Sequence, residues 1–231
     1  MNRLIQFENG LIGDKESIEK LSQKESAKIL LFSDSHGKAP LLREAILQKG
    51  KNADCLVFLG DGSYDLTSIL EESFSDERIK DSLPPVIAIV CGNGDSSHCI
   101  VSFDVKTGKK LNSGCTSLKI PEEIIFSVSN KNIFITHGNR QGVYFGTSNL
   151  QAEAQIKNAQ IAFFGHTHIP AELNHSVYIV NPGSVGSPRS FSPNSFAIVE
   201  ITQKYNYAIF YKIPKNLNDG FTPYIPDIYS I

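Results

Sequence analysis

The chain has 231 residues, of which 22 are basic and 24 acidic, so its formal net charge at pH 7 is −2. This balance gives no general attraction to nucleic acid or to an anionic membrane. No apolar run reaches membrane-spanning length, and the first ten residues lack a basic segment followed by a sustained apolar one. We therefore expect a single-domain cytoplasmic protein that contacts no membrane and shows no strong sign of nucleic-acid binding.

The first part of the chain predicts an alternation of strand and helix. Residues 1–27 are a polar lead-in, after which residues 28–32 are apolar, continuous and short, as in a buried strand. A helix follows from Pro40 to Gly50, and residues 54–59 give the next apolar strand. A strand, a helix and a strand in this order favour two parallel strands joined by a crossover.

The rest of the chain predicts more strands than helices. A helix over 66–80 leads, past Pro84 and Pro85, to a third buried strand over 86–91. Residues 96–120 are less regular, and we expect a loop or hairpin excursion there. The remaining predicted elements are strands at 124–128 and 133–136 that form a hairpin, a helix at 148–159, a strand at 161–164, and strands at 177–180, 196–201 and 205–213.

Polar side chains follow five of these strands, at the point where each strand ends. Taken singly they have plain explanations, because an Asp after a strand is usually a turn residue and an Asn between glycines suits a tight turn. Two histidines at i and i+2 on extended backbone, however, project on the same side and reach one pocket. Open sheets also place their ligands at the carboxyl ends of the strands. The candidate metal ligands are Asp34, His36, Asp61, Asn93, His137, His166 and His168.

In chain order these motifs are Asp-x-His, Gly-Asp, Gly-Asn, His-Gly and Gly-His-x-His, a series that resembles the calcineurin-like metallophosphoesterase superfamily. Within it, residues 29–213 are similar to the small single-domain phosphodiesterases of bacteria and archaea. The resemblance implies an α/β (α+β) fold of two mixed β-sheets packed as a sandwich flanked by helices. It also implies one domain over 1–231, with an extension at 1–27, a catalytic core at 28–213 and a tail at 214–231.

The resemblance assigns a role to each ligand: Asp34, His36 and His168 would hold one ion, Asn93, His137 and His166 would hold the other, and Asp61 would bridge them. Carboxylate, amide and imidazole ligands without thiolate suit transition metals better than an all-oxygen magnesium site. We expect two divalent ions, Mn²⁺ first, with Ni²⁺, Fe, Co²⁺ and Zn²⁺ left open. Ions about 3.5–4 Å apart would activate a bridging hydroxide to attack a phosphodiester.

One position departs from the family pattern. Where relatives carry His or Cys after the metal-binding Asn, this chain has Gly94, which cannot donate a proton to the leaving group. We therefore expect a preference for aryl or nucleotidyl diesters, whose leaving groups need little help. His98 is a candidate substitute acid, with an exposed loop histidine as the alternative, and Asp95 keeps the family position without its usual partner. The catalytic candidates are thus Asp61, Asn93, Asp95 and His98.

Two further residues are candidates for substrate binding. A guanidinium matches phosphate geometry, so Arg189 is expected to contact substrate, with a stabilising contact inside its Pro-rich turn as an equal alternative. Asn139, just after His137-Gly138, is a weaker candidate. The 96–120 excursion would either wall the cleft or join subunits of a homo-oligomer.

Two other functions stay open. A phosphomonoesterase acting on small molecules or phosphoproteins would use the same ligands. A non-catalytic scaffold, similar to the retromer subunit of this fold, is favoured by Gly94, but a pure scaffold has no chemical need to keep all seven ligands. In the leading interpretation the partner is a small phosphodiester substrate.

Overall fold

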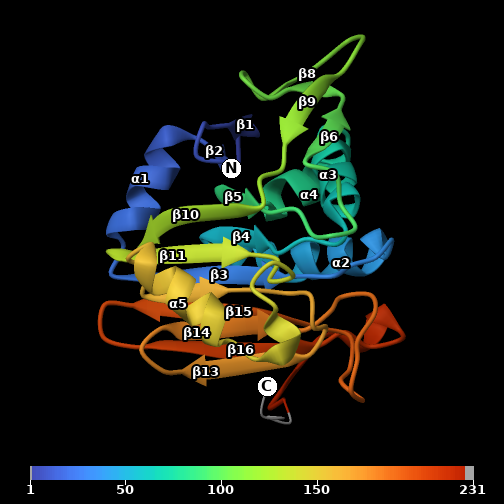
Figure 1. The fold of residues 1–231 in the computed structure, drawn as a ribbon. Coiled ribbons are helices and arrows are strands. Elements are labelled where there is room, and N and C mark those ends of the chain that lie inside the picture. Colours follow the sequence, from blue (N-terminus) through green and yellow to red (C-terminus); the bar gives the residue numbers. More distant parts are fainter. Residues whose placement is uncertain (1, 227–231) are drawn as a thin grey trace.

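The computed structural model describes residues 2–226 and shows two β-sheets packed face to face, with helices on both outer sides (Figure 1). The larger sheet has eight strands and the smaller has five. This arrangement confirms the predicted sandwich of mixed sheets flanked by helices.

The larger sheet is built around three parallel strands, β3, β4 and β5, as the alternation of strands and helices predicted. Antiparallel strands extend it on both sides. In spatial order its strands are β1 (Ile5–Gln6), β2 (Leu11–Gly13), β5 (Val86–Ile89), β4 (Cys55–Phe58), β3 (Ser26–Phe32), β15 (Ser195–Thr202), β16 (Asn206–Lys212) and β17 (Thr222–Tyr224).

The smaller sheet also has parallel strands at its centre. β11, β12 and β14 run parallel, while the two edge strands are antiparallel to their neighbours. In spatial order the strands are β10 (Glu123–Val128), β11 (Lys131–Thr136), β12 (Ile161–Phe163), β14 (Tyr178–Pro182) and β13 (Pro170–Asn174). The predicted hairpin is thus β10 and β11.

The central strands are apolar throughout because both of their faces are covered. In β3, Ile29 and Leu31 pack between the two sheets, whereas Leu30 and Phe32 pack under the helices, and all four are fully buried. Each such side chain contributes about 1.5–3 kcal/mol through its burial. The strands therefore form a rigid base for the loops at their ends.

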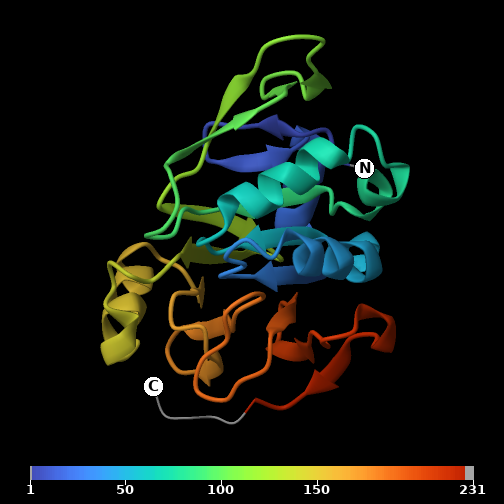
Figure 2. The same ribbon diagram turned by 90° about the vertical axis from the view of Figure 1, so that its right-hand side faces the viewer.

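Helices cover both outer faces. α2 (Ala39–Lys49) and α3 (Ser63–Glu72) lie side by side on the larger sheet with α4 (Glu77–Ser82) (Figure 2), and α5 (Ser148–Ile156) covers the smaller one. The single helix predicted over 66–80 is wrong, because Asp76 caps a new helix by accepting the Arg78 N–H at 2.9 Å. None of the helices in residues 2–226 is both long and apolar enough to cross a membrane.

Three segments contain structure that the sequence reading left open. The lead-in contributes β1, β2 and α1 (Lys15–Gln23), and β2 extends the larger sheet beside β5. The excursion forms two ribbons that project from the body (Figure 1), pairing β6 (His98–Val101) with β9 (Thr116–Lys119) and β7 (Phe103–Asp104) with β8 (Lys109–Lys110). The predicted tail includes β17, and its residues 227–231 lie outside the described part.

Candidate metal centre

Six of the seven predicted ligands meet where four strands of the two sheets end. Asp34 and His36 follow β3, Asp61 follows β4, and His137 follows β11. His166 and His168 follow β12, which lies beside β11. Because β3 and β4 are parallel, and so are β11 and β12, the carboxyl ends of each pair reach the same edge of their sheet.

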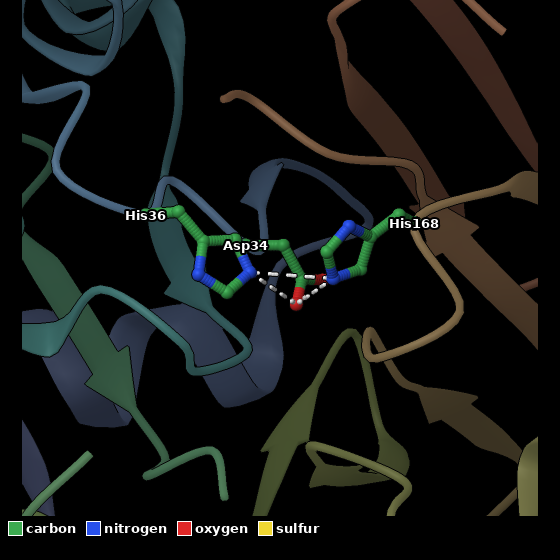
Figure 3. Close-up of side chains that lie close together, drawn as sticks. All are labelled: Asp34, His36 and His168. Carbon is green, nitrogen blue, oxygen red and sulfur yellow. Dashed lines mark hydrogen bonds and ion pairs between the residues drawn. The ribbon is translucent and has the colours of Figure 1, made fainter. Parts of the chain in front are cut away.

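A first group contains Asp34, His36 and His168. Figure 3 shows the Asp34 carboxylate between the two imidazole rings. Asp34 Oδ1 lies 3.1 Å from His168 Nε2 and 3.8 Å from His36 Nε2. The two Nε2 atoms are 3.3 Å apart. Three ligand atoms therefore face one small volume from three different positions in the chain.

A second group contains Asp61 and His137, again with Asp34. Asp61 Oδ2 lies 3.6 Å from His137 Nε2, and His166 Nδ1 lies 3.1 Å from that same Nε2. The same Asp61 oxygen is 3.8 Å from His36 Nε2 of the first group. The Asp61 carboxylate thus lies within 3.8 Å of an imidazole nitrogen of each group, which is the position that a bridging ligand requires, and Asp34 is a member of both groups.

Hydrogen bonds to backbone carbonyls fix which nitrogen two of the imidazoles turn inward. His137 Nδ1 contacts the Leu59 carbonyl at 2.6 Å, and His168 Nδ1 contacts the Ser187 carbonyl at 2.5 Å. A carbonyl only accepts, so each Nδ1 carries the hydrogen and a neutral ring presents the Nε2 lone pair to the centre. This is the tautomer that a metal-binding histidine needs.

One buried carboxylate oxygen has no hydrogen-bond partner. Asp34 Oδ2 accepts from the Ser33 hydroxyl at 2.5 Å and from the His166 N–H at 3.0 Å. Asp34 Oδ1 is buried and has no hydrogen-bond donor while His168 is neutral, because His168 Nε2, 3.1 Å away, then carries no hydrogen. Within residues 2–226 only Tyr224 Oη is also buried without a partner. An unpaired buried carboxylate oxygen is costly unless a cation neutralises it. The donor set therefore fits a divalent metal centre.

The backbone at these ligands is strained. Five of them adopt a left-handed conformation that non-glycine residues avoid: the φ angles are 54° at Asp34, 44° at His36, 54° at Asp61, 66° at His166 and 60° at His168. Such residues persist where surrounding contacts hold them, and they concentrate at functional sites. The strain indicates that the chain holds these side chains in place for binding.

Asp95 holds the loop that carries Asp61. Its carboxylate accepts four backbone N–H groups: those of Asp61 at 2.7 Å and of Gly62, Ser63 and Gly92 at 3.0 Å each. Two of these donors begin α3, so the negative charge also suits the positive end of that helix. In this structure Asp95 positions Asp61, and its oxygens are occupied by the backbone.

Asp65 holds the loop that carries His36, as Asp95 holds the loop that carries Asp61. Its Oδ2 accepts from the Ser35 hydroxyl at 2.5 Å and from the Gly37 N–H at 2.9 Å, the two residues that flank His36. Asn181 supports the third loop, because its amide donates to the Gly165 carbonyl at 2.9 Å. Sequence reasoning missed Asp65, since a buried acid in a first helical turn looks like an ordinary cap.

The charges of the centre shift several pKa values. Burial opposes ionisation of Asp61, but the contact with His137 and the N–H of Gly94 outweigh it and lower its pKa to about 2. Burial likewise opposes protonation of His137 and His168, yet the nearby carboxylates raise the pKa of both. For His166, burial and the charge of His137 lower the pKa, so this ring is readily neutral.

The Asn93 loop lies against Asp61. The Gly94 N–H donates to Asp61 Oδ1 at 2.7 Å, and a Cβ at Gly92 would lie only 2.1 Å from that oxygen, so no side chain fits there. The side chain of Asn93 is exposed between these two glycines. The loop is thus next to the second group.

The remaining candidates are on the surface. His98 starts β6 with an exposed ring 3.0 Å from the Ser97 hydroxyl, and no described contact joins it to the centre. Asn139 is also exposed. Arg189 is exposed, and its guanidinium carbon lies 5.5 Å from the ring centre of Tyr144. Tyr144 contacts His166, a proximity that no sequence pattern indicated.

Comparisons with known proteins show that this chain is similar to phosphoesterases. The model of the calcineurin-like phosphoesterase superfamily domain matches residues 27–204. Phosphodiesterase YfcE of Escherichia coli is 26% identical over 181 residues, which cover 75% of this chain and 87% of that protein.

Two solved structures share the fold. A predicted phosphoesterase of Streptococcus pneumoniae aligns with a TM-score of 0.58 at 23% identity, over 87% of this chain and 98% of the other. Vacuolar Protein Sorting 29 of Cryptosporidium parvum aligns with a TM-score of 0.61 at 16% identity, over 87% and 97%. Because the family model spans most of its length, this chain belongs to the calcineurin-like phosphoesterase superfamily.

Proposed function

We propose that this phosphoesterase is a phosphodiesterase that works with two divalent transition-metal ions. The observation that carries the proposal is the shared Asp61 carboxylate, which lies within 3.8 Å of an imidazole nitrogen in each of the two groups. The name of the E. coli relative, a phosphodiesterase, supports the choice of a diester substrate.

Asp34, His36 and His168 would hold one ion, and Asn93, His137 and His166 the other, with Asp61 between them. When bound, the ions supply positive charge for phosphoryl oxygens and lower the pKa of the attacking water. The protein holds the tautomers of His137 and His168 through backbone carbonyls, and the lowered pKa of Asp61 keeps that carboxylate ionised. The nitrogen and oxygen donor set suits Mn²⁺, Fe, Ni²⁺, Co²⁺ or Zn²⁺, and Mn²⁺ is the ion that we propose first.

The lack of a general acid at Gly94 limits which esters the centre can hydrolyse. Gly94 offers only a backbone N–H, and that N–H is already donated to Asp61. No described contact brings His98 to the centre, so His98 is not placed to protonate an alkoxide. Substrates with aryl or nucleotidyl leaving groups need little protonation and suit such a site. Arg189, exposed beside Tyr144, is the proposed contact for a phosphoryl oxygen.

The test compares two chromogenic esters before and after metal removal. Protein stripped with a chelator should lose hydrolysis of bis(p-nitrophenyl) phosphate and regain it when Mn²⁺ is added back. The diester should also be hydrolysed faster than p-nitrophenyl phosphate. Hydrolysis that survives complete metal removal, or the absence of hydrolysis with every metal tried, would contradict the proposal. A faster monoester reaction would favour a phosphomonoesterase instead.

A scaffold role is the second candidate, and two observations favour it: the missing acid at Gly94 and the fold shared with Vacuolar Protein Sorting 29. The strained, hydrogen-bonded ligand loops argue for the enzyme, because a binding scaffold gains nothing from keeping five residues at positive φ around one point.

A further inference from the structure

Two turns border the metal centre, and both are bonded to the backbone of its ligands. The first turn, η2 (Val143–Phe145), carries Tyr144, whose hydroxyl donates to the His166 carbonyl at 2.8 Å. In the second turn, the Arg189 N–H donates to the His168 carbonyl at 3.3 Å. Arg189 also reaches over Tyr144, with 5.5 Å between its guanidinium carbon and the ring centre. The two turns therefore lie side by side next to His166 and His168.

These turns expose aromatic rings to an unusual degree. Phe145 is 97% exposed and Phe191 is 105% exposed, while Tyr144 is 46% exposed. A soluble protein gains stability by covering such rings, so two open phenylalanines next to a catalytic centre require a reason. We call Tyr144, Phe145 and Phe191 the aromatic collar.

The backbone fixes the turns that carry these rings. Gly142 and Gly146 have positive φ angles of 65° and 120° and bound the first turn. In the second, Ser190 and Phe191 have φ angles of 53° and 60°, and the Ser192 N–H donates to the Arg189 carbonyl at 3.0 Å. A left-handed aromatic residue is a true outlier that favourable contacts must offset. Because the backbone of the turns is already ordered, a ligand has to order only the side chains of Phe145 and Phe191 when it binds.

The chemistry around the collar selects its ligand. The Tyr144 ring lies 4.7 Å from the His166 ring, edge to face, so the collar begins at the centre itself. Beside it stands one guanidinium, Arg189, which suits a phosphoryl oxygen or a planar ring. Aromatic faces stack on planar groups with little regard for their identity. A phosphate that carries a planar aromatic substituent matches this combination.

We propose that the aromatic collar binds the planar aromatic substituent, aryl or nucleobase, of the diester that the centre hydrolyses. The inference rests on the proposed function and adds to it the residues that select the substrate. Tyr144 acts at the inner end of the collar, and Phe145 and Phe191 act farther out.

The experiment compares diesters that share one leaving group, p-nitrophenolate, and differ in the retained substituent. The substituents are methyl, phenyl and 5′-thymidine, and the methyl and thymidine esters have similar intrinsic reactivity. In the Mn²⁺-loaded protein we expect kcat/KM for the thymidine ester to exceed that for the methyl ester by about tenfold. The phenyl ester shows whether an aryl ring suffices or a nucleobase is needed.

The variants Phe145→Ala, Phe191→Ala and Tyr144→Leu should each lower the thymidine-to-methyl ratio by about three- to tenfold. Tyr144→Phe keeps the ring and should largely keep the ratio. Tyr205→Ala is the matched control, because Tyr205 is a 57% exposed ring that follows the opposite end of β15. Circular dichroism melts show whether each variant is folded.

A binding measurement separates this inference from the proposed function. Calorimetry should show thymidine 5′-monophosphate binding about tenfold more tightly than methyl phosphate, with the difference reduced in Phe191→Ala. If the wild type hydrolyses no diester, the proposed function fails, while this binding difference still reports on the collar. If neither the ratio nor the binding difference responds to the three variants, the inference is overturned and the rings belong to a surface for a macromolecule.

Discussion

The two halves of the metal centre differ in how completely the protein builds them. In the first, Asp34 is fully buried, its Oδ1 is unpaired, and His168 is held by the Ser187 carbonyl, while His36 is exposed. In the second, His137 is equally fixed by the Leu59 carbonyl, but His166 is half-buried and Asn93 is exposed. Asp61 belongs to both halves.

The difference indicates an order of metal affinity. The first half presents a carboxylate oxygen that only a cation satisfies, so it should bind its ion more tightly. The second half depends on the exposed amide of Asn93, an uncharged ligand that has to be ordered when the ion binds. The variants below are arranged to remove or invert that difference.

The largest expected effect comes from Asp61→Asn. Because its Oδ2 faces both halves, the variant should bind fewer than two ions and lose at least about 10³-fold in kcat/KM for an aryl diester. Metal analysis and steady-state kinetics measure both quantities. Asp104→Asn is the control, since Asp104 only supports a turn in the projecting ribbon. A variant that keeps two ions and full activity would remove Asp61 from the centre.

The next largest effect comes from replacing Asp95 and Asp65, the two acids that position the loops of Asp61 and His36. Asp95→Ala frees four backbone N–H groups around Asp61, and Asp65→Ala frees the loop that carries His36. Each should weaken metal binding by about 10–100-fold, as losses of supporting hydrogen bonds usually do. Calorimetric titration with Mn²⁺ should show Asp65→Ala affecting mainly the tighter site, whereas Asp95→Ala, which loosens the Asp61 loop beside both halves, should weaken both sites. A weakening of both sites by Asp65→Ala as well would mean that the halves act as one unit.

Acid should weaken metal binding. The pKa values of His137 and His168 are raised, so protons occupy them to a higher pH than in a free histidine and compete with the ion. The apparent Mn²⁺ affinity should therefore still rise above pH 6.5, by about tenfold per pH unit for each proton displaced. Titrations from pH 6 to 8 measure the slope. An affinity that levels off below pH 6 would show that these imidazoles are not ligands.

The same shifts have a consequence for the metal-free protein. The folded pKa of Asp61 is lowered to about 2, so its ionisation stabilises the fold at neutral pH, and that contribution is lost as pH falls from about 4 to about 2. For His137 the sign is opposite, because its raised pKa stabilises the fold at low pH and that contribution is lost as pH rises through the folded pKa. Denaturation curves of Asp61→Asn and the wild type should therefore converge toward acid pH.

The smallest expected effect is an increase in the rate of hydrolysis, caused by Gly94→His. Gly94→His places an imidazole beside the second half, at a position where a Cβ would lie 3.2 Å from Asp61 Oδ1 and requires a small shift. Since the new acid is not optimally placed, hydrolysis of an alkyl leaving group should rise by about threefold, well below the full value of a general acid. Hydrolysis of an ester with an aryl leaving group should increase less. Equal gains for both leaving groups would contradict the role assigned to the missing acid.

Much of the site was predictable because ligands follow apolar strands. The run 28–32 and the stretch 161–164 mark buried strands, so Asp34, His36, His166 and His168 had to lie at a sheet edge. Their spacing indicated one pocket, and the structure brings these four side chains together. The expected extended backbone is wrong, however, because all four residues have positive φ angles. The sequence could not place Asn93 or Arg189, because their side chains are on loops whose course depends on contacts with distant segments.

Other features depend on tertiary contacts that leave no local pattern. The lead-in became part of the larger sheet because β5 offered a free edge to β2, which has only three residues. Asp95 looked like a catalytic partner, yet three backbone donors from the Asp61 loop and one from its own loop converge on it. The helix over 66–80 was divided by a cap at Asp76 that its apolar periodicity concealed.

The central claim is that side chains from separate strand ends hold two cations. The most direct measurement is the anomalous diffraction of crystals soaked in Mn²⁺. We predict two peaks, one among Asp34, His36 and His168 and one beside His137 and His166, with Asp61 between them and the first peak filling at the lower Mn²⁺ concentration. A map without a peak at either position, or with manganese bound only elsewhere on the chain, would contradict the account.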